Sequence, residues 1–183
     1  MAHHRVTMEI VVPDPCLVVL VGAAGAGKST FAARHFAPDE VLSSDRYRAI
    51  VSGDASNQAA TRQAFGRLHR TLSSRLSKGL LTVVDATNVE AWARRALVTR
   101  AAAAGVPSIA IVLDLPPTTV LGRNAARRER VVDEAVVHRH LDAVTQTRAA
   151  LGTAGSREGF ADVIVLREPA AVDGVRIVRR RPA

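Results

Sequence analysis

The stretch "GAAGAGKST", residues 22–30, follows directly on the apolar run "CLVVLV", residues 16–21. It fits the pattern G-x-x-x-x-G-K-[ST], which a buried strand must precede and a helix must follow. Gly22, Gly25 and Gly27 allow the backbone to turn tightly, so that successive N–H groups and the positive end of the helix surround a phosphate. The segment therefore predicts a phosphate-binding loop (P-loop), and this loop requires an α/β fold around it.

The residues that end this loop are of the types that handle a nucleoside triphosphate. We expect Lys28 to reach the β- and γ-phosphates of ATP, and the Ser29 hydroxyl to bind Mg²⁺. Thr30 is expected to support the first turn of the following helix at the same ATP site. Because P-loops occur in switches, motors and small kinases alike, the motif predicts phosphate binding and leaves the reaction open.

Short runs rich in Val, Ile and Leu alternate with longer helical patterns along the rest of the chain. We expect five strands, at 16–21, 40–44, 80–86, 108–115 and 162–166. Near-continuous apolar runs between helices are typical of a parallel sheet covered on both faces. The predicted fold class is therefore α/β, with helices on both faces of a parallel sheet.

The helical patterns are marked by apolar stripes and by capping residues. We expect a helix with the stripe Phe65, Leu68, Leu72 and Leu76, one from the N-cap Asn88 to Gly105, and helices over 116–131 and 133–152. The tail, 173–183, is expected to form one short edge strand and a basic stub at 176–183.

Length and composition limit the class of protein. A chain of 183 residues fits one compact domain, 1–183. Its 25 Lys and Arg against 17 Asp and Glu give a net charge of +8, which fits a polyanionic partner such as nucleic acid and equally a solvated basic surface.

Cys16 is the only cysteine, so no intrachain disulfide can form. The longest apolar run is far shorter than the roughly 20 residues of a membrane span, and no signal peptide is recognisable. We therefore expect a soluble, cytoplasmic protein without a membrane partner.

Two carboxylates follow expected strands and should lie near the P-loop, because ligands gather at the carboxyl ends of parallel strands. Asp85 ends the run 80–86 and is expected to hold Mg²⁺ or one of its waters. A capping role for Asp85 is less favoured, because Asn88 already suits the helix start. Asp45 follows the run 40–44, where a catalytic role and a helix-capping role are equally compatible with the sequence. Arg48 fits either an ion pair with Asp45 or a contact to the substrate.

Three arginines in "LGRNAARRER" are spaced for one helix face. Arg123, Arg127 and Arg130 lie within roughly a 60° arc at about 100° per residue. Such a face is either solvated or forms an arginine lid over a transferring phosphoryl group, with the lid at about 116–140. Arg128 lies off this face. His138 and His140 lack carboxylate or cysteine neighbours at metal-ligand spacing, and we interpret them as surface or packing residues.

Taken together, six segments resemble the 5′-kinase domain of the bacterial polynucleotide kinase-phosphatases of RNA repair systems, over nearly the whole chain. They are "GAAGAGKSTFAARHF", "EVLSSDRYRAIVS", "LTVVDATNVEAWARRALV", "AIVLDLP", "RNAARRERVVDEAVVHRHL" and "REGFADVIVL". The resemblance implies a P-loop phosphotransferase with the strand order 2-3-1-4-5, which moves the γ-phosphate of ATP to a 5′-OH end of RNA or DNA.

The same resemblance implies roles for individual residues. It places the P-loop lysine and serine at Lys28 and Ser29, and the general base at Asp45. It also implies that Arg48 binds the acceptor and that Arg123 and Arg127 are the lid arginines.

This chain departs from the family pattern at Ala126, where the family often has Asn. Family members commonly carry phosphatase and sometimes ligase modules, and the sequence leaves open whether such modules belong to a longer parent chain. A kinase of a small hydroxylated metabolite or antibiotic would share the phosphate-handling residues. An ATP-dependent switch would share them too but would need no general base.

Overall fold

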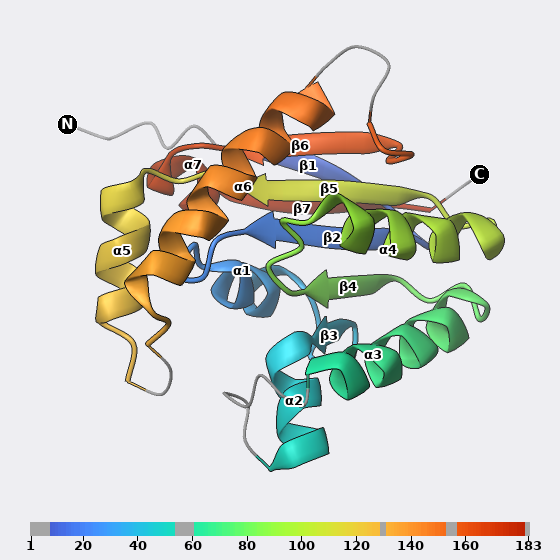
Figure 1. The fold of residues 1–183 in the computed structure, drawn as a ribbon. Coiled ribbons are helices and arrows are strands. Elements are labelled where there is room, and N and C mark those ends of the chain that lie inside the picture. Colours follow the sequence, from blue (N-terminus) through green and yellow to red (C-terminus); the bar gives the residue numbers. More distant parts are fainter. Residues whose placement is uncertain (1–7, 54–60, 129–130, 153–156, 182–183) are drawn as a thin grey trace.

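The computed structural model describes residues 8–53, 61–128, 131–152 and 157–181. Its main sheet has five parallel strands in the order β3-β4-β2-β5-β6 (Figure 1). The strands are β2 Leu17–Gly22, β3 Val41–Ser43, β4 Thr82–Asp85, β5 Ser108–Leu113 and β6 Asp162–Leu166. Numbered by the five strands expected from the sequence, this order reads 2-3-1-4-5.

Helices cover both faces of this sheet, which confirms the predicted α/β class. They are α1 Lys28–His35, α2 Ser44–Ser52, α3 Thr61–Leu76, α4 Ala91–Ala103, α5 Pro117–Ala125, α6 Glu134–Gly152 and α7 Pro169–Asp173. Strands β2, β4 and β5 are buried along their whole length, because their side chains alternate between two cores. Val18 and Leu20 of β2 pack on the side of α1, whereas Val19 packs on the side of α3 and α4.

A second, two-stranded parallel sheet pairs β1 Met8–Pro13 with β7 Val175–Arg180. The short strand expected in the tail is present as β7, but this strand includes most of the segment expected to be a basic stub, so the prediction of a stub is wrong; β1 was not predicted from the sequence. Arg176 of β7 pairs with Glu9 of β1 at 3.2 Å, and Arg179 pairs with Glu40 at 2.7 Å. The basic tail is thus part of the fold through the carboxylates that it meets.

The helix expected from the stripe Phe65, Leu68, Leu72 and Leu76 is confirmed as α3, and the helix expected over 133–152 is confirmed as α6. The helix expected to begin at the N-cap Asn88 begins later, at Ala91, with Glu90 as its N-cap. Asn88 instead adopts a positive φ of 49°, and its side-chain amide donates to the Leu20 carbonyl at 2.8 Å. Asn88 is therefore structural, as a tie between the loop after β4 and strand β2.

The helix expected over 116–131 ends at Ala125, because a tertiary contact overrides the good helix formers that follow. The buried Asn124 amide donates to the Val132 carbonyl at 2.7 Å and accepts from the Val132 N–H at 3.1 Å. Arg127 thus lies beyond the helix, and Arg130 lies outside the described residues. The expectation of one helix face shared by Arg123, Arg127 and Arg130 is wrong.

Among the described residues, no helix combines the length and the apolar character that a membrane crossing requires.

Candidate active site

The P-loop runs from the end of β2 to the first turn of α1 in a conformation that depends on glycine. Gly25 and Gly27 have φ values of 91° and 94°, in the left-handed region that other residues adopt rarely. A Cβ atom at Gly25 would lie 2.6 Å from the Val120 carbonyl oxygen of α5. The Gly22 N–H donates to the Thr87 carbonyl at 3.0 Å. The loop is therefore held between α5 and the loop after β4.

Lys28 is the first residue of α1 and is only 8% exposed. Its Nζ donates to the carbonyl oxygens of Gly22 at 2.8 Å and of Ala23 at 2.9 Å. The pKa of Lys28 is lowered to about 8, because burial and, to a smaller extent, the nearby charge of Arg127 lower this pKa by more than the charge of Asp85 raises it. The ammonium group is thus charged at neutral pH and lies within the loop expected to hold phosphate.

Ser29 and Asp85 meet beside Lys28. The Ser29 hydroxyl donates to Asp85 Oδ2 at 2.7 Å, and Asp85 is buried at the carboxyl end of β4. Two hard oxygen ligands side by side are what Mg²⁺ prefers. Within the described part of the chain, no group of three or more His, Cys, Asp or Glu side chains is placed to hold a metal ion. The Ser29–Asp85 pair is the arrangement expected from the sequence, and it fits a magnesium-nucleotide site.

Asp45 and Arg48 form an ion pair in the first turns of α2. Ser43 is the N-cap of α2, since its side chain accepts from the Arg46 N–H at 3.5 Å. The alternative in which Asp45 caps this helix is therefore wrong. The Arg48 side chain is 8% exposed, whereas the Asp45 side chain is 46% exposed. Arg48 thus fixes a carboxylate that remains accessible.

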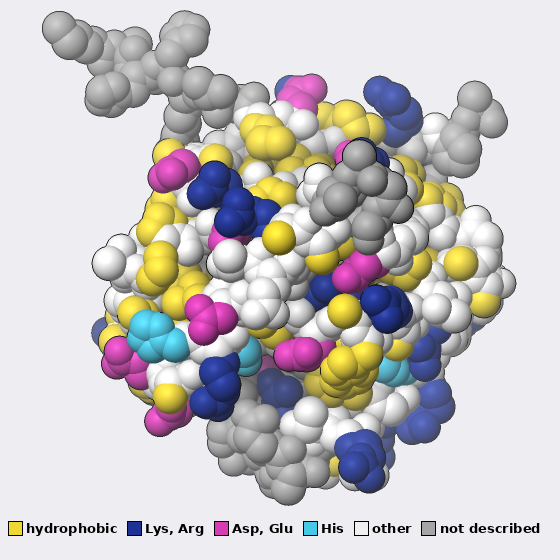
Figure 2. Space-filling view, turned by 45° about the horizontal axis from the view of Figure 1, so that its top comes forward, with side chains coloured by type: hydrophobic (Ala, Val, Ile, Leu, Met, Phe, Trp, Pro, Cys, Tyr) yellow, Lys and Arg dark blue, Asp and Glu magenta, His cyan; other side chains and the backbone are white. Residues whose placement is uncertain are grey.

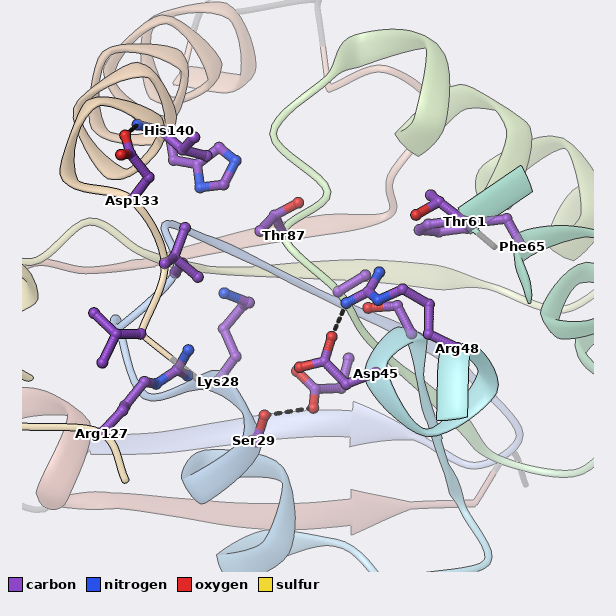
Figure 3. Close-up of a pocket in the computed structure, with 17 residues that line it drawn as sticks. Lys28, Ser29, Asp45, Arg48, Thr61, Phe65, Thr87, Arg127, Asp133 and His140 are labelled. Atoms are coloured by element: carbon purple, nitrogen blue, oxygen red, sulfur yellow. Dashed lines mark hydrogen bonds and ion pairs between the residues drawn. The ribbon is translucent and has the colours of Figure 1, made fainter. Parts of the chain in front are cut away.

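One cavity of about 560 Å³ brings these groups together (Figure 3). Lys28 and Ser29 project from α1, and Asp45 and Arg48 from α2. Other residues of the cavity wall are Thr61 and Phe65 of α3, Thr87 after β4, Arg127 and Asp133 beyond α5, and His140 of α6. The cavity therefore joins a phosphate-handling side to a side that holds a carboxylate and an arginine.

The two arginines that the resemblance assigns to a lid lie differently. Arg127 lines the cavity, close enough to Lys28 to lower the pKa of that lysine. Arg123 lies in the last turn of α5, outside the cavity wall, and its Nη1 donates to the Ala26 carbonyl of the P-loop at 3.4 Å. Arg128 does not line the cavity. Thr30 lies in the first turn of α1 as expected, and it is exposed.

Several cavity residues were missed by sequence reasoning. Phe65 was interpreted only as part of an apolar stripe, and His140 as a surface or packing residue, but both line the cavity. Thr61 Oγ1 is buried and has no hydrogen-bond partner among the residues that the structure describes. Residues 54–60 separate α2 from α3, and no local pattern signals that the first turn of α3 faces the P-loop. His138, by contrast, is a surface residue that pairs with Glu134 at 3.5 Å.

Comparison with known proteins shows that other proteins share this fold. The solved structures that match include the Pnkp1/Rnl/Hen1 RNA repair complex, with a TM-score of 0.64 and 22% identity over 75% of this chain and 46% of that chain. The chain thus spans less than half of the length of that relative. Shikimate kinase from Acinetobacter baumannii, solved with shikimate, matches with a TM-score of 0.51 and 22% identity over 87% of each chain. A gluconokinase from Sinorhizobium meliloti 1021 matches with a TM-score of 0.51 and 14% identity over 89% of this chain and 93% of that chain.

These identities are low, so the three structures show a shared fold and leave the acceptor open. No curated protein matches the chain significantly. The family model AAA_33, described as an AAA domain, matches residues 17–151, which is well over half of the sequence. On this match, and with the P-loop built as described above, the chain belongs to the AAA_33 family and has a P-loop kinase-type fold.

Proposed function

We propose that this protein is an ATP-dependent polynucleotide 5′-hydroxyl kinase that acts on RNA or DNA ends. One observation carries the proposal: a single cavity holds the P-loop residues Lys28 and Ser29 together with the Asp45–Arg48 pair. A switch that only binds ATP has no need of an accessible carboxylate across from the phosphate loop. A kinase needs one, because an alcohol is a poor nucleophile at neutral pH.

In the proposed reaction, Asp45 accepts the proton of the acceptor hydroxyl as the hydroxyl oxygen bonds to the γ-phosphorus. The bond from the γ-phosphorus to the bridging oxygen breaks, and ADP leaves. Lys28 and Arg127 place positive charge beside the phosphoryl group, which is the main contribution that a protein makes to phosphoryl transfer. Arg123 supports the loop from outside through Ala26.

Ser29 and Asp85 are proposed to hold Mg²⁺ or a water bound to it. When bound, the ion neutralises charge on the β- and γ-phosphates. The protein contributes two oxygens, Ser29 Oγ on α1 and Asp85 Oδ2 on β4, which lie 2.7 Å apart at the end of the P-loop.

The acceptor side of the cavity supports a nucleic acid end. Arg48 offers a cation for the nearest phosphate, Phe65 an apolar ring for a base or sugar, and Thr61 a buried hydroxyl without a partner in the described chain. The net charge of +8 favours a polyanionic acceptor. Shikimate kinase and gluconokinase share the fold, so a small hydroxylated metabolite is the second candidate acceptor. Phosphatase or ligase modules are proposed as partners, by analogy with the RNA repair complex.

The acceptor class is tested with labelled ATP, Mg²⁺ and four acceptors: 5′-OH RNA, 5′-OH DNA, the same strands with a 5′-phosphate, and free nucleosides. We expect label transfer to the 5′-OH strands alone. Acceptor affinity should also weaken with salt, by roughly 0.7 log units per contacted phosphate for each tenfold rise in salt. Turnover of nucleosides equal to that of strands, or affinity indifferent to salt, would assign the enzyme to small metabolites.

A separate prediction concerns the lid. Arg127→Ala should lower kcat by at least about tenfold with little change in the KM for ATP, because a charge-assisted contact of about 1.5–3 kcal/mol strengthens as charge spreads in the transition state. Arg123→Ala should have a smaller effect, since Arg123 touches the P-loop backbone and not the cavity. Steady-state kinetics with Arg128→Ala as the matched control decide the matter. If all three variants behaved alike, the arginines would be no more than a solvated surface.

A further inference from the structure

A second hollow, of about 680 Å³, adjoins α2 and α3 on their side toward the edge strand β3. We call it the α2–α3 groove. Its wall residues used below are Arg46, Tyr47 and Ile50 of α2, Arg70 and Arg75 of α3, and Lys78 and Leu80 after α3. Asp45 and Arg48 of α2 line the active-site cavity instead, so α2 separates the two hollows. Tyr47, whose position beside Asp45 suggests a stacking role at the reacting end, lies in this groove and not in the cavity.

The groove carries four cationic side chains and one carboxylate, Asp39. Arg75 is fixed by bonds of 3.1 Å to the Thr82 hydroxyl and to a backbone carbonyl. The side chains of Arg46, Arg70 and Lys78, by contrast, are exposed, and no ion pair is recorded for them within the described part of the chain.

Glu40, which follows Asp39 in the sequence, does not neutralise the positive charge of the groove. Glu40 accepts from both terminal nitrogens of Arg179 at 2.7 Å, and this arginine holds the pKa of Glu40 below its usual value against the effect of burial. The α2–α3 groove therefore has a positive surplus that a polyanion would match. Figure 2 shows several Lys and Arg side chains along the lower right of the face that it presents.

Apolar surface lies among these charges. Ile50 and Leu80 are 56% and 42% exposed, and the partly buried Tyr47 lines the same groove and packs against the core beneath it. A groove that combines cations for a backbone with apolar and aromatic surfaces for bases is the arrangement that single-stranded nucleic acid binding uses. An isolated phosphate would need only the cations.

We propose that the α2–α3 groove binds the acceptor strand beyond its 5′ end, so that recognition extends past the reacting nucleotide. This inference rests on the proposed function. Both hollows share α3 as a wall: Phe65 lines the cavity, and Arg70 to Ser74 line the groove roughly 8 to 14 Å further along the helix at about 1.5 Å per residue. On α2, Arg46 and Tyr47 of the groove directly follow Asp45 of the cavity, so a short strand with its 5′-hydroxyl at Asp45 reaches the groove by passing over α2.

The test compares the double variant R46E/R70E with the parent protein. Both side chains are exposed, and Arg75 is left intact because it supports the fold. Binding of a 3′-labelled single strand of about ten nucleotides, a length within the site sizes of single-strand-binding grooves, is measured by fluorescence anisotropy without ATP over a range of salt. We expect the variant to lose at least about tenfold in affinity and about 1.4 log units of salt slope, as for two lost phosphate contacts. Turnover of a 5′-OH dinucleotide and the KM for ATP should stay unchanged.

Arg95→Glu is the control for a charge reversal elsewhere on the surface, because Arg95 is an exposed helix arginine outside both hollows. It should bind the strand like the parent. Equal affinity of R46E/R70E and the parent, or an equal loss in R95E, would overturn the inference and leave the proposed kinase activity standing. Competition by polyglutamate as strong as that by a strand of equal charge would assign the groove to an acidic protein and would likewise overturn it. If the groove-dependent salt slope is present but no acceptor is phosphorylated, the proposed function fails while strand binding in the groove stands.

Discussion

Replacement of Asp45 by Asn is expected to lower phosphoryl transfer to a 5′-OH end by at least about 100-fold, the lower bound for loss of a general base. The amide keeps the size of the side chain and can still accept from Arg48, but it cannot take a proton. ATP affinity should stay near that of the parent, because Asp45 lies on α2 and the phosphate loop lies between β2 and α1. Single-turnover transfer and ATP binding by calorimetry measure the two effects separately.

Thermal unfolding of the same variant is the control. Ser43 caps α2, so Asp45→Asn should remove the interaction of a first-turn carboxylate with the helix dipole, about 0.3–1 kcal/mol, and the negative charge of the ion pair with Arg48, while the amide oxygen still accepts from Arg48. A variant that still transfers phosphate at more than about a tenth of the parental rate would contradict the base assignment, because loss of a base predicts a much larger effect. A variant that unfolds is replaced by Asp45→Ser, which also lacks a base and preserves a polar side chain at the helix start.

The part of the site that is local in sequence was predictable. The glycine pattern gave the loop, the strand before it and the helix after it, and the end of the run 80–86 placed Asp85 beside Ser29. Both follow from one rule: parallel strands bring their carboxyl ends to one edge of the sheet. The pairing of Asp45 with Arg48 was also predictable from the sequence, since Arg48 lies three residues later in the same helix.

The part that depends on distant contacts was not predictable. Local propensity favours a helix through "AARRERV", but the Asn124 side chain takes both backbone groups of Val132 and ends α5 early. Because α5 ends before Arg127, this arginine lies outside the helix and lines the cavity near Lys28, whereas Arg123 stays in the last turn of α5 and does not line the cavity. The pairing of β1 with β7 joins the two ends of the described chain, and no pattern within either segment specifies such a partner.

Replacement of Lys28 by Met is expected to weaken ATP use by about 30- to 5,000-fold in kcat/KM, since removing one partner of a buried charged contact costs about 2–5 kcal/mol. Met fills the same narrow space but donates nothing to the phosphates or to the carbonyl oxygens of Gly22 and Ala23. Two buried acceptors then lose a partner, so thermal unfolding is measured alongside the kinetics. If Met destabilises the fold, Lys28→Gln, which can still donate to one carbonyl, takes its place.

The pH dependence of ATP binding provides the readout that a structural role for Lys28 would not change. Burial lowers the pKa of Lys28 to about 8, and anionic phosphates select its charged form. Binding is therefore independent of this group well below pH 8. Above pH 8 the free protein must first regain a proton, so ATP affinity should fall by up to about tenfold per pH unit. The Lys28→Met protein lacks the titrating amine at position 28. It should therefore bind ATP weakly, with an affinity that does not change between about pH 7 and pH 9.5. An unchanged fall of affinity in this variant would show that another group titrates, and a flat profile in the parent would show that phosphate binding does not depend on the buried ammonium.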